Sequence, residues 1–516
     1  MHRRSSTQFN IQAMSSIQLC KMLKDRDVLS KPIITEIYNR ALFLLQTEDA
    51  RYNRLQFDAR GLATILYQFA KLNYVIGHEF IYAWTNKAIN LMDEFNSQDL
   101  SNSLWALGRL EIHPSDQFIN AWIHHATKTI DHFTPQNLAN SIWAFGRLKI
   151  HPSDQFINAW IHHATKTIDN FNPQELANSV LAFGRLEIHS SDQFINAWIH
   201  HATKIIDNFN PQGLANSILA LGQLEIHPSD QFINAWIHHA TKTIDNFSLQ
   251  ELANSIYGIF TLNVLCNSKI KLPQLFISAV NQNIELFDEN IEDIGQILKA
   301  HYYFGKQGVG ILTSQNRQLL EKKFKTKLTP YHTSNLHLNV LKVVKKVLAQ
   351  HTVKSEHYIK QITSSVDIFI KEKNTVIQVD GPCHFDDNNA LNFSTRLNTE
   401  LLKSYGYIVH RIPYWVWDKL RTNTDKEEYI CELICTDEFV SQSETLEEVF
   451  YDAQENIPEQ STSEILPHSE SQVSDDVFYD AYEYIPQDLL THESSSHYDM
   501  QALGNIGSSD FETRSL

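Results

Sequence analysis

Two aspartates and a histidine near residue 370 are side chains that could carry out a reaction. Alternating apolar residues predict two strands joined as a hairpin, at 366–370 and 375–381. Asp367 is expected at the end of the first strand, and Asp380 with His384 at the end of the second. Carboxylates at a sheet edge can hold Mg²⁺, and a histidine can move a proton in phosphodiester cleavage. These three residues are therefore candidate catalytic residues.

A second set of polar residues recurs every 38 positions and could bind a ligand. Carboxamides both donate and accept hydrogen bonds and so can bond to base edges, while arginines bind phosphates or stack on bases. The recurring residues are Gln98, Gln136, Gln174, Gln212 and Gln250; Asn102, Asn140, Asn178, Asn216 and Asn254; and Arg109, Arg147 and Arg185.

These residues belong to a repeat that covers about residues 58–262. One phrase, SDQFINAWIHHATKTID, recurs almost unchanged around Trp122, Trp160, Trp198 and Trp236, with a looser copy at Trp84. Each unit predicts two helices. The first starts at a cap residue followed by proline, and a His-Pro-Ser break precedes the second. One pair cannot bury its apolar stripe alone, so the pairs must stack into a solenoid. With degenerate pairs at 16–50 and 268–326, we expect seven to eight pairs.

The first helix of the unit at 135–148 is apolar over most of its circumference, which indicates an inner layer. Trp143 falls in the broad apolar arc. We expect the remaining narrow stripe to line the concave surface, with its small residue leaving room for a ligand. The stripe contains Gln136, Asn137, Asn140, Ala144 and Arg147.

The residues alone leave three uses of this stripe open. It could bind RNA, it could bind a peptide, or its asparagines could satisfy backbone groups between repeats. The residue after each recurring glutamine varies, as expected of a position that discriminates between bases. Those residues are Asp99, Asn137, Glu175, Gly213 and Glu251.

From about residue 337 the periodicity changes to that of a small α/β domain. A helix near 337–350 precedes the two strands, and a further helix ends at Gly406 as its cap. A strand over 407–417 and a short helix follow, so the predicted order after the first helix is β-β-α-β-α. Trp415 and Trp417 in the last strand could stack on bases or belong to the core.

The formal net charge of −17 looks unfavourable for a nucleic-acid-binding protein. However, residues 436–516 contain nineteen acidic residues and one basic residue. Residues 317–374 contain twelve basic and four acidic residues. The acidity is therefore a property of the tail, and the body of the chain can offer a local polyanion site.

Metal binding and membrane insertion have little support in the sequence. The five cysteines lie far apart and are interpreted as free thiols. Adjacent histidines such as His162 and His163 recur with the repeat, but equivalent residues of stacked helix pairs should lie about 10 Å apart, too far to share an ion. No apolar stretch is long enough to span a bilayer. We expect no cofactor, and Mg²⁺ only if the chain is a nuclease.

The repeat resembles the octotricopeptide repeat of organellar RNA-processing factors and is similar to the helical repeats of the FAST kinase family. The phrase that carries the resemblance is FNPQELANSVLAFGRL with its variants, in units of 38 residues. The second helix departs from the family pattern, since HPSDQFINAW replaces a proline-rich Glu-Trp start. The resemblance implies RNA binding.

Residues 355–421 resemble the RAP domain, through VDIFI, IQVDGPCHF and LNTELLKSYGYIVHRIPYWVW. The resemblance implies RNA binding, RNA maturation and a fold similar to restriction-type nucleases. That nuclease pattern requires an acid and a lysine where this chain has Gln378 and Asp380. The alternative to catalysis is that Asp367 and Asp380 are turn and hydrogen-bonding residues and that His384 packs.

The sequence thus predicts an α-solenoid followed by a small, restriction-endonuclease-like α/β domain and a disordered acidic tail. The predicted function is gripping single-stranded RNA in RNA processing, stability or translation. The alternatives are an RNA endonuclease and a protein-interaction scaffold or secreted effector, because two tyrosine-containing tail phrases could dock a protein partner. The compartment is expected to be a bacterial cytoplasm or an organelle, with secretion into a host cell as a further option. The predicted segments are 1–57 (helical cap), 58–262 (repeats), 263–336 (degenerate repeats), 337–425 (RAP-like domain) and 436–516 (tail).

Overall fold

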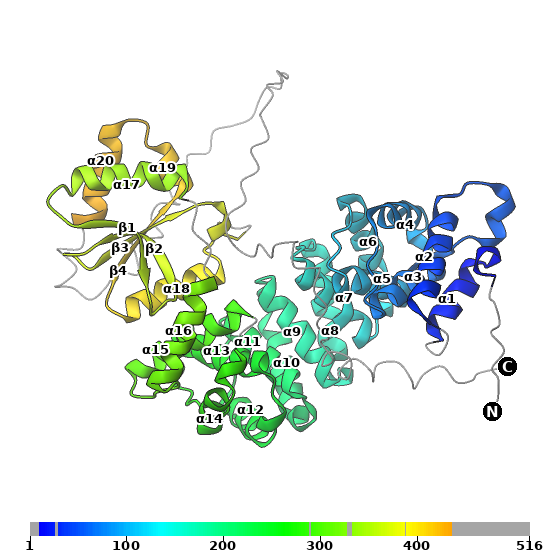
Figure 1. Cartoon of the computed structure of the whole chain (residues 1–516), viewed down its shortest axis with the longest axis horizontal. Helices are drawn as coiled ribbons and strands as arrows, with labels where there is room; N and C mark the ends of the chain where they lie inside the picture. Colours follow the sequence, from blue (N-terminus) through cyan, green and yellow to red (C-terminus); the bar gives the residue numbers. More distant parts are fainter. Residues whose placement is uncertain (1–9, 26–28, 288–289, 328–332, 387–388, 436–516) are drawn as a thin grey trace. The chain divides into compact units, whose positions relative to one another are not determined.

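A computed structural model describes residues 10–25, 29–287, 290–327, 333–386 and 389–435. Within these ranges, helices follow one another in tandem from residue 11 to residue 347, and a four-stranded sheet with its own helices comes next (Figure 1). The predicted fold class is confirmed for this part of the chain. The predicted tail, with its two tyrosine-containing phrases, lies outside the described residues. None of the described helices is both long enough and apolar enough to cross a membrane.

Eight successive helix pairs precede the sheet in the described ranges. We call the first helix of each pair an A helix and the second a B helix. The A helices are α1 (Ser16–Lys24), α3 (Ala59–Lys71), α5 (Ser97–Arg109), α7 (Pro135–Leu148), α9 (Pro173–Arg185), α11 (Pro211–Gln223), α13 (Leu249–Leu265) and α15 (Ile291–Lys306). The B helices are α2 (Lys31–Gln46), α4 (His78–Asn90), α6 (Asp116–Thr129), α8 (Asp154–Thr167), α10 (Asp192–Ile205), α12 (Asp230–Lys242), α14 (Gln274–Gln282) and α16 (Ser314–Lys327).

The helices begin where cap residues and prolines predicted them. The Asn172 side chain accepts a hydrogen bond from the N–H of Glu175 at 3.0 Å, and Pro173 takes the first helical position of α9. The Ser153 side chain caps α8 in the same way, by accepting from the N–H of Phe156. Because the cap residues recur with the repeat, so do the helix boundaries.

A tryptophan in each repeated B helix holds that helix against the A helix of the same pair. The indole N–H of Trp160 donates to the carbonyl of Leu138 at 3.0 Å, and the indole is fully buried. A buried indole N–H needs a partner, so the bond and the burial together identify a structural residue. Equivalent bonds of 2.9–3.1 Å join Trp84 to Leu62, Trp122 to Leu100, Trp198 to Leu176 and Trp236 to Leu214.

The second histidine of each adjacent pair links its repeat to the preceding one. His163 Nε2 lies 2.9 Å from the carbonyl oxygen of Phe133, and because a carbonyl only accepts, Nε2 carries the proton. The first histidine, His162, is exposed on the B helix. The same bond joins His125 to Phe95, His201 to Phe171 and His239 to Phe209. These imidazoles are therefore links between repeats.

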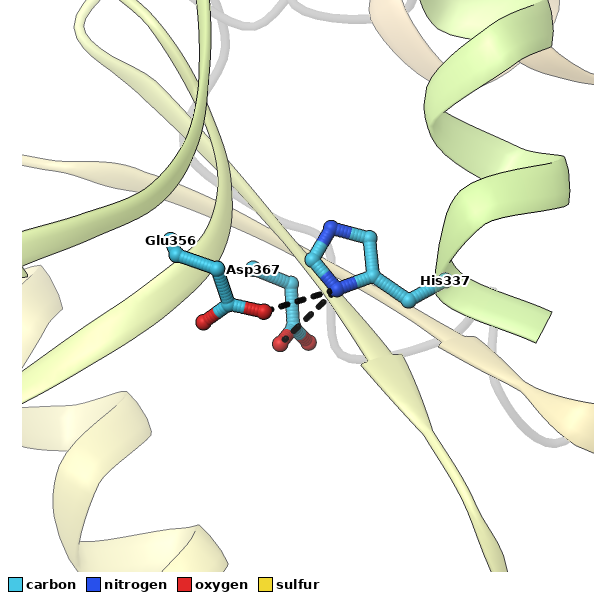
Figure 2. A group of neighbouring side chains, drawn as sticks. All are labelled: His337, Glu356 and Asp367. Atoms are coloured by element: carbon cyan, nitrogen blue, oxygen red, sulfur yellow. Dashed lines mark ion pairs between the residues drawn. The ribbon is translucent and has the colours of Figure 1, made fainter. Parts of the chain in front are cut away.

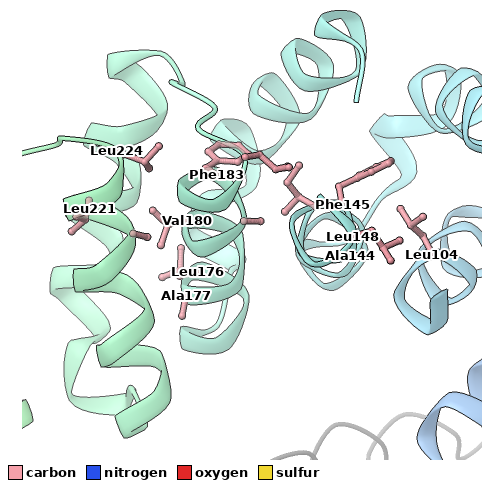
Figure 3. Close-up of a cluster of buried hydrophobic side chains, with 14 of the residues drawn as sticks. Leu104, Ala144, Phe145, Leu148, Leu176, Ala177, Val180, Phe183, Leu221 and Leu224 are labelled. Atoms are coloured by element: carbon pink, nitrogen blue, oxygen red, sulfur yellow. The ribbon is translucent and has the colours of Figure 1, made fainter. Parts of the chain in front are cut away.

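Neighbouring A helices approach each other closely because a glycine of one faces an alanine of the next. A Cβ at Gly146 would lie 3.0 Å from the Cα of Ala182, and Gly108 stands in the same relation to Ala144. Figure 3 shows the buried side chains between these helices, among them Phe145. The close approach brings the corresponding faces of successive A helices next to one another.

The sheet of the C-terminal domain contains one strand more than the sequence predicted. Its strands are β1 (Val353–Ile359), β2 (Ser364–Ile370), β3 (Thr375–Asp380) and β4 (Ile408–Pro413), in that order across the sheet. β1 and β3 pair antiparallel with β2, whereas β4 pairs parallel with β3. The sequence of β1, VKSEHYI, is mostly polar, and its side chains are exposed or half-buried except Ile359. An edge strand of this kind lacks the apolar alternation used to predict strands.

Two groups of helices pack on the sheet. One core joins α17 (Asn335–Val347), α19 (Tyr414–Lys419) and α20 (Asn423–Cys435) to strand residues such as Ile377 and Ile412. α18 (Phe393–Ser404) instead shares a core with Phe369 and Val376, and that core is continuous with the solenoid core. The predicted strand over 407–417 is wrong beyond Pro413, because Tyr414 to Lys419 form α19. Proline lacks an N–H for the ladder, which favours ending a strand there.

Candidate nucleic-acid interface

The recurring amides lie in register along the A helices, on side chains that solvent can reach. The five asparagines are half-buried, and the five glutamines are exposed or half-buried. None of these ten carboxamides forms a hydrogen bond with any residue that the structure describes. In four of the five repeats the serine that follows the asparagine does form such a bond within its own helix, as buried Ser141 does to the carbonyl of Leu138 at 2.9 Å, whereas the Ser255 hydroxyl has no partner among the described residues. The asparagines therefore do not satisfy backbone groups between repeats, which was one of the three expected uses.

The variable residue after the glutamine has a structural role in four of the five repeats, all but that of Gly213, and the sequence interpretation missed this role. Asn137 is 6% exposed, accepts from the N–H of Thr134 at 3.1 Å and donates to the hydroxyl of Ser101 at 2.8 Å. Glu175 accepts from the N–H of Asn172 at 2.9 Å, and burial raises the pKa of its carboxyl group. This position lies three residues after the cap and closes a capping box. These side chains are already engaged, which argues against a base-reading role.

The helical wheel placed two residues of α7 incorrectly. Ala144 is fully buried against Gly108 of α5, so it leaves no room for a ligand. Trp143, which was assigned to the apolar arc, is only half-buried and stacks on Trp105 with ring centroids 6.2 Å apart. On a 100° wheel, Trp143 falls about 20° from Gln136 and about 40° from Arg147, on the same side as the polar stripe. The solvent-facing stripe is therefore Gln136, Asn140, Trp143 and Arg147.

The arginines end this stripe near the C-terminal ends of α5, α7 and α9. Arg109 is half-buried and has no ion-pair partner among the described residues. Arg147 forms an ion pair with Glu111 of the preceding repeat, and its side chain remains 43% exposed. Arg185 is exposed on α9. Lys71 takes the corresponding place on α3 and was not predicted from the sequence.

The predicted catalytic residues fall into two separate groups. Asp380 is 1% exposed and forms a bidentate ion pair with Arg411, one of whose bonds joins Nε to Oδ2 at 2.8 Å. His384 Nδ1 lies 3.8 Å from Asp380 Oδ1 and 3.2 Å from the hydroxyl of Thr395. These contacts make Asp380 the buried partner of an arginine. A carboxylate in that state is poorly suited to bind a cation.

Asp367 belongs to the other group and lies in the middle of β2, not at the strand's end. Its Oδ2 accepts from the N–H of Val379 at 2.6 Å, and its own N–H donates to the Gln378 side chain at 3.0 Å. Burial raises the pKa of Asp367 to about 7. The strand starts at Ser364, before the apolar run that the sequence interpretation used.

His337 of α17 and Glu356 of β1 complete this second group (Figure 2). His337 Nδ1 lies 3.1 Å from Glu356 Oε1 and 3.8 Å from Asp367 Oδ1. One ligand atom from each residue falls within 4.8 Å of the others. Burial lowers the pKa of the His337 imidazole, and Glu356 beside it acts in the opposite direction. This group could not be predicted from the sequence, because the strand β1 that carries Glu356 was not predicted.

The two tryptophans of the C-terminal domain differ in exposure. Trp417 is 2% exposed and belongs to the core, so it cannot stack on a base. Trp415 is half-buried, and its ring centroid lies 4.3 Å from that of Phe385. The core interpretation therefore holds for Trp417, and stacking on bases is open only to Trp415.

The C-terminal domain is bound to the solenoid through α18. Arg396 Nε donates to Glu225 Oε1 at 2.5 Å, and Arg396 also pairs with Glu187 at 3.4 Å. Glu187 accepts from the N–H of Phe393 at 2.8 Å, which places a carboxylate at the N-terminus of α18. Glu187 and Glu225 occupy equivalent positions of the repeat, just after α9 and α11. The same repeat position thus contributes two carboxylates to the contact with α18.

Comparison with known families agrees with both parts of the structure. Residues 377–433 match the RAP domain, and residues 55–290 match the family of the RNA-editing substrate-binding complex 6 protein. No curated protein matches the chain. The first match covers the sheet from β3 through α20, and the second covers the repeats from α3 to α14. The chain is therefore a helical-repeat protein that carries a RAP domain.

Proposed function

We propose that the chain binds single-stranded RNA along its A helices and acts in RNA processing. The observation that carries the proposal is the row of ten carboxamides that are accessible to solvent and have no partner among the described residues. Unpartnered donors and acceptors at a fixed spacing can bond to base edges. Arg109, Arg147 and Arg185 lie in the same stripe and can bind phosphates.

The two family matches support the same proposal from an independent direction. One matched family is named for an RNA-editing substrate-binding complex, and its match covers the helices that carry the amide row. We infer that the chain is a component of an RNA-processing assembly. The repeat and family resemblances support the organellar compartment among those predicted, and they give no support to the bacterial or secreted alternatives.

Single-stranded RNA is the favoured form because a duplex hides the base edges that amides would contact. The groove of an A-form helix that displays bases is too shallow to admit a row of helices, whereas unpaired bases can be splayed onto a protein surface. Corresponding residues of successive A helices are separated by about 8–10 Å, as for any packed helices. That spacing suits about one nucleotide per repeat.

The residues present do not fit the Mg²⁺ site that an endonuclease would need. Mg²⁺ prefers oxygen ligands, but the group around Asp367 includes the imidazole of His337. Asp380 is held by Arg411, and Gln378 replaces the expected acid. We therefore propose no cleavage step for the RAP domain.

A triple substitution tests the proposal: Asn102→Ala, Asn140→Ala and Asn178→Ala in the full-length chain. Each good amide–base contact contributes about 1 kcal/mol or more, so we expect RNA affinity to fall roughly 100-fold. The matched control replaces Asn120, Asn158 and Asn196, exposed asparagines of the B helices in the same repeats, and should bind like the wild type. Equal affinities for the two triple variants would contradict the proposal. Retention of a nuclease-insensitive protein partner without RNA would instead favour an interaction scaffold.

A further inference from the structure

Three aromatic side chains form a continuous surface on the first repeated A helices. Tyr67, Trp105 and Trp143 occupy the same position of the repeat on α3, α5 and α7, and all three are half-buried. The ring centroids of Tyr67 and Trp105 are 5.0 Å apart, and those of Trp105 and Trp143 are 6.2 Å apart at 29°. We call these three residues the aromatic platform.

The fold does not require an aromatic residue at this position. The next two repeats have Leu181 and Leu219 there, and both leucines are buried, with 4% and 8% exposure. Leucine thus builds the same helix pair without leaving an aromatic ring at the surface. The half-exposed indoles of Trp105 and Trp143 therefore need an explanation other than packing.

The platform also differs from the tryptophans that hold the repeats together. Trp122 and Trp160 of the B helices are fully buried, and each indole N–H donates to a leucine carbonyl. The indole N–H groups of Trp105 and Trp143 form no hydrogen bond with any described residue. Each of these two indoles therefore has a ring face that solvent can reach and an N–H group that can donate to a ligand.

Cations flank the platform in all three contributing repeats, and recurring amides flank it in the two repeats that carry a tryptophan. Lys71 Nζ lies 5.6 Å from the centre of the Tyr67 ring, and Arg109 and Arg147 follow Trp105 and Trp143 by four residues, one helical turn further on. Asn102 and Asn140 lie about one turn before the two indoles. Interleaved aromatic rings and cations are the pattern of surfaces that bind single-stranded nucleic acid.

We propose that the aromatic platform stacks consecutive bases of single-stranded RNA, with the backbone phosphates against Lys71, Arg109 and Arg147. This inference rests on the proposed function. It specifies in addition which repeats bind the RNA by stacking on its bases. Stacking depends little on base identity, because every base has a π-face. The platform would therefore supply affinity in the repeats of α3, α5 and α7, whereas the repeats with leucine would depend on their amides.

The chain itself provides the substitution that tests this inference. Trp105→Leu and Trp143→Leu install the residue that α9 and α11 already carry, so the helices should form as before. In the full-length protein we expect each substitution to weaken binding of a single-stranded RNA oligonucleotide roughly 10-fold, and the pair roughly 100-fold. Trp105→Phe keeps a ring and should retain most of the affinity. Tyr82→Leu, at a B-helix tyrosine that is 65% exposed, is the matched control and should change nothing.

The salt dependence of binding separates the failure of this inference from failure of the proposed function. Removing a stacking ring should lower affinity without changing the slope of affinity against salt, because that slope reports phosphate contacts. If the wild type binds RNA and the double leucine variant binds equally well, the platform is wrong and the proposed function stands. If the wild type binds no RNA, both are wrong. Two further outcomes would overturn the platform. One is that Tyr82→Leu lowers the affinity as much as the tryptophan substitutions do. The other is that the tryptophan variants lose helical circular dichroism, because the loss of affinity would then result from unfolding.

Discussion

The two sets of polar residues that the sequence predicted as functional lie on the A helices and in the RAP domain. They differ in whether their side chains have partners within the protein. On the A helices, ten carboxamides in register have no partner among the described residues. In the RAP domain, the candidate catalytic carboxylates are engaged: Asp380 by Arg411, and Asp367 by the N–H of Val379. A polar group without a hydrogen-bond partner in the protein destabilises the fold unless water or a ligand can reach it. The difference teaches that the unpartnered polar side chains lie on the solenoid, where we propose that RNA binds, whereas the candidate carboxylates of the RAP domain are held by contacts within that domain.

The largest expected effect comes from reversing the charge of the stripe. Arg109→Glu, Arg147→Glu and Arg185→Glu together should lower RNA affinity roughly 1,000-fold, because three cations are replaced by anions beside the phosphates. The slope of log affinity against log salt should become shallower by about 2, given about 0.7 per phosphate on a single strand. Fluorescence anisotropy across a salt series measures both quantities. Wild-type affinity in this variant, with intact helical circular dichroism, would show that the arginines do not face RNA.

A second prediction addresses the engaged carboxylate of the RAP domain. Arg411→Met leaves Asp380, which is 1% exposed, without its ion-pair partner, and should lower the free energy of unfolding by about 3 kcal/mol. Adding Asp380→Asn should recover most of that loss, since the buried charge is then gone. Chemical denaturation followed by circular dichroism checks both variants. A stability loss below about 0.5 kcal/mol, the size of an ordinary surface substitution, would mean that the pair is not structural.

The smallest expected effect concerns pH and Asp367. Burial raises its pKa from 3.8 to about 7, so the folded state holds a proton that the unfolded state has released in that interval. Stability contributed by this group is therefore present at low pH and is lost as pH rises between about 4 and 7. Near pH 8, Asp367→Asn should be more stable than the wild type by something on the order of 1 kcal/mol.

Thermal unfolding of both proteins from pH 5 to pH 8 measures that difference. Glu356, His337, Asp380 and Arg411 also act on this carboxyl group, so only the difference between the two proteins is informative. The advantage of the asparagine variant should grow as pH rises. If the stability advantage of Asp367→Asn instead decreases as pH rises, the pKa of Asp367 is not raised in the folded protein.

Much of the solenoid could be predicted from the sequence because its signals are local. Cap residues such as Asn172 act within one turn, and a 38-residue period repeats each signal several times. The expected stripe is wrong at Ala144 and Trp143: residue type alone suggests an open small position and a buried indole, whereas the angular position of Trp143 lies beside Gln136 and Arg147. Close packing of Gly108 on Ala144 is a contact between repeats, and no single helix reveals it.

The RAP domain was harder to predict because its key contacts join distant segments. Asp380 meets Arg411 across neighbouring parallel strands, and His337 reaches Asp367 from a helix thirty residues upstream. β1 was missed because an exposed edge strand shows no apolar alternation. Side chains that chemistry alone suggested as a catalytic set were thus divided by topology into two groups.

The most direct test of the central claim is ultraviolet crosslinking of the full-length protein to a random single-stranded RNA pool, with the crosslinked peptides identified by mass spectrometry and the bound RNA sequenced. We predict that crosslinks concentrate on the A helices from α3 to α13, at residues such as Trp105 and Trp143. Crosslinks confined to the basic segment 317–374 or to the RAP domain, with none on the A helices, would contradict the account.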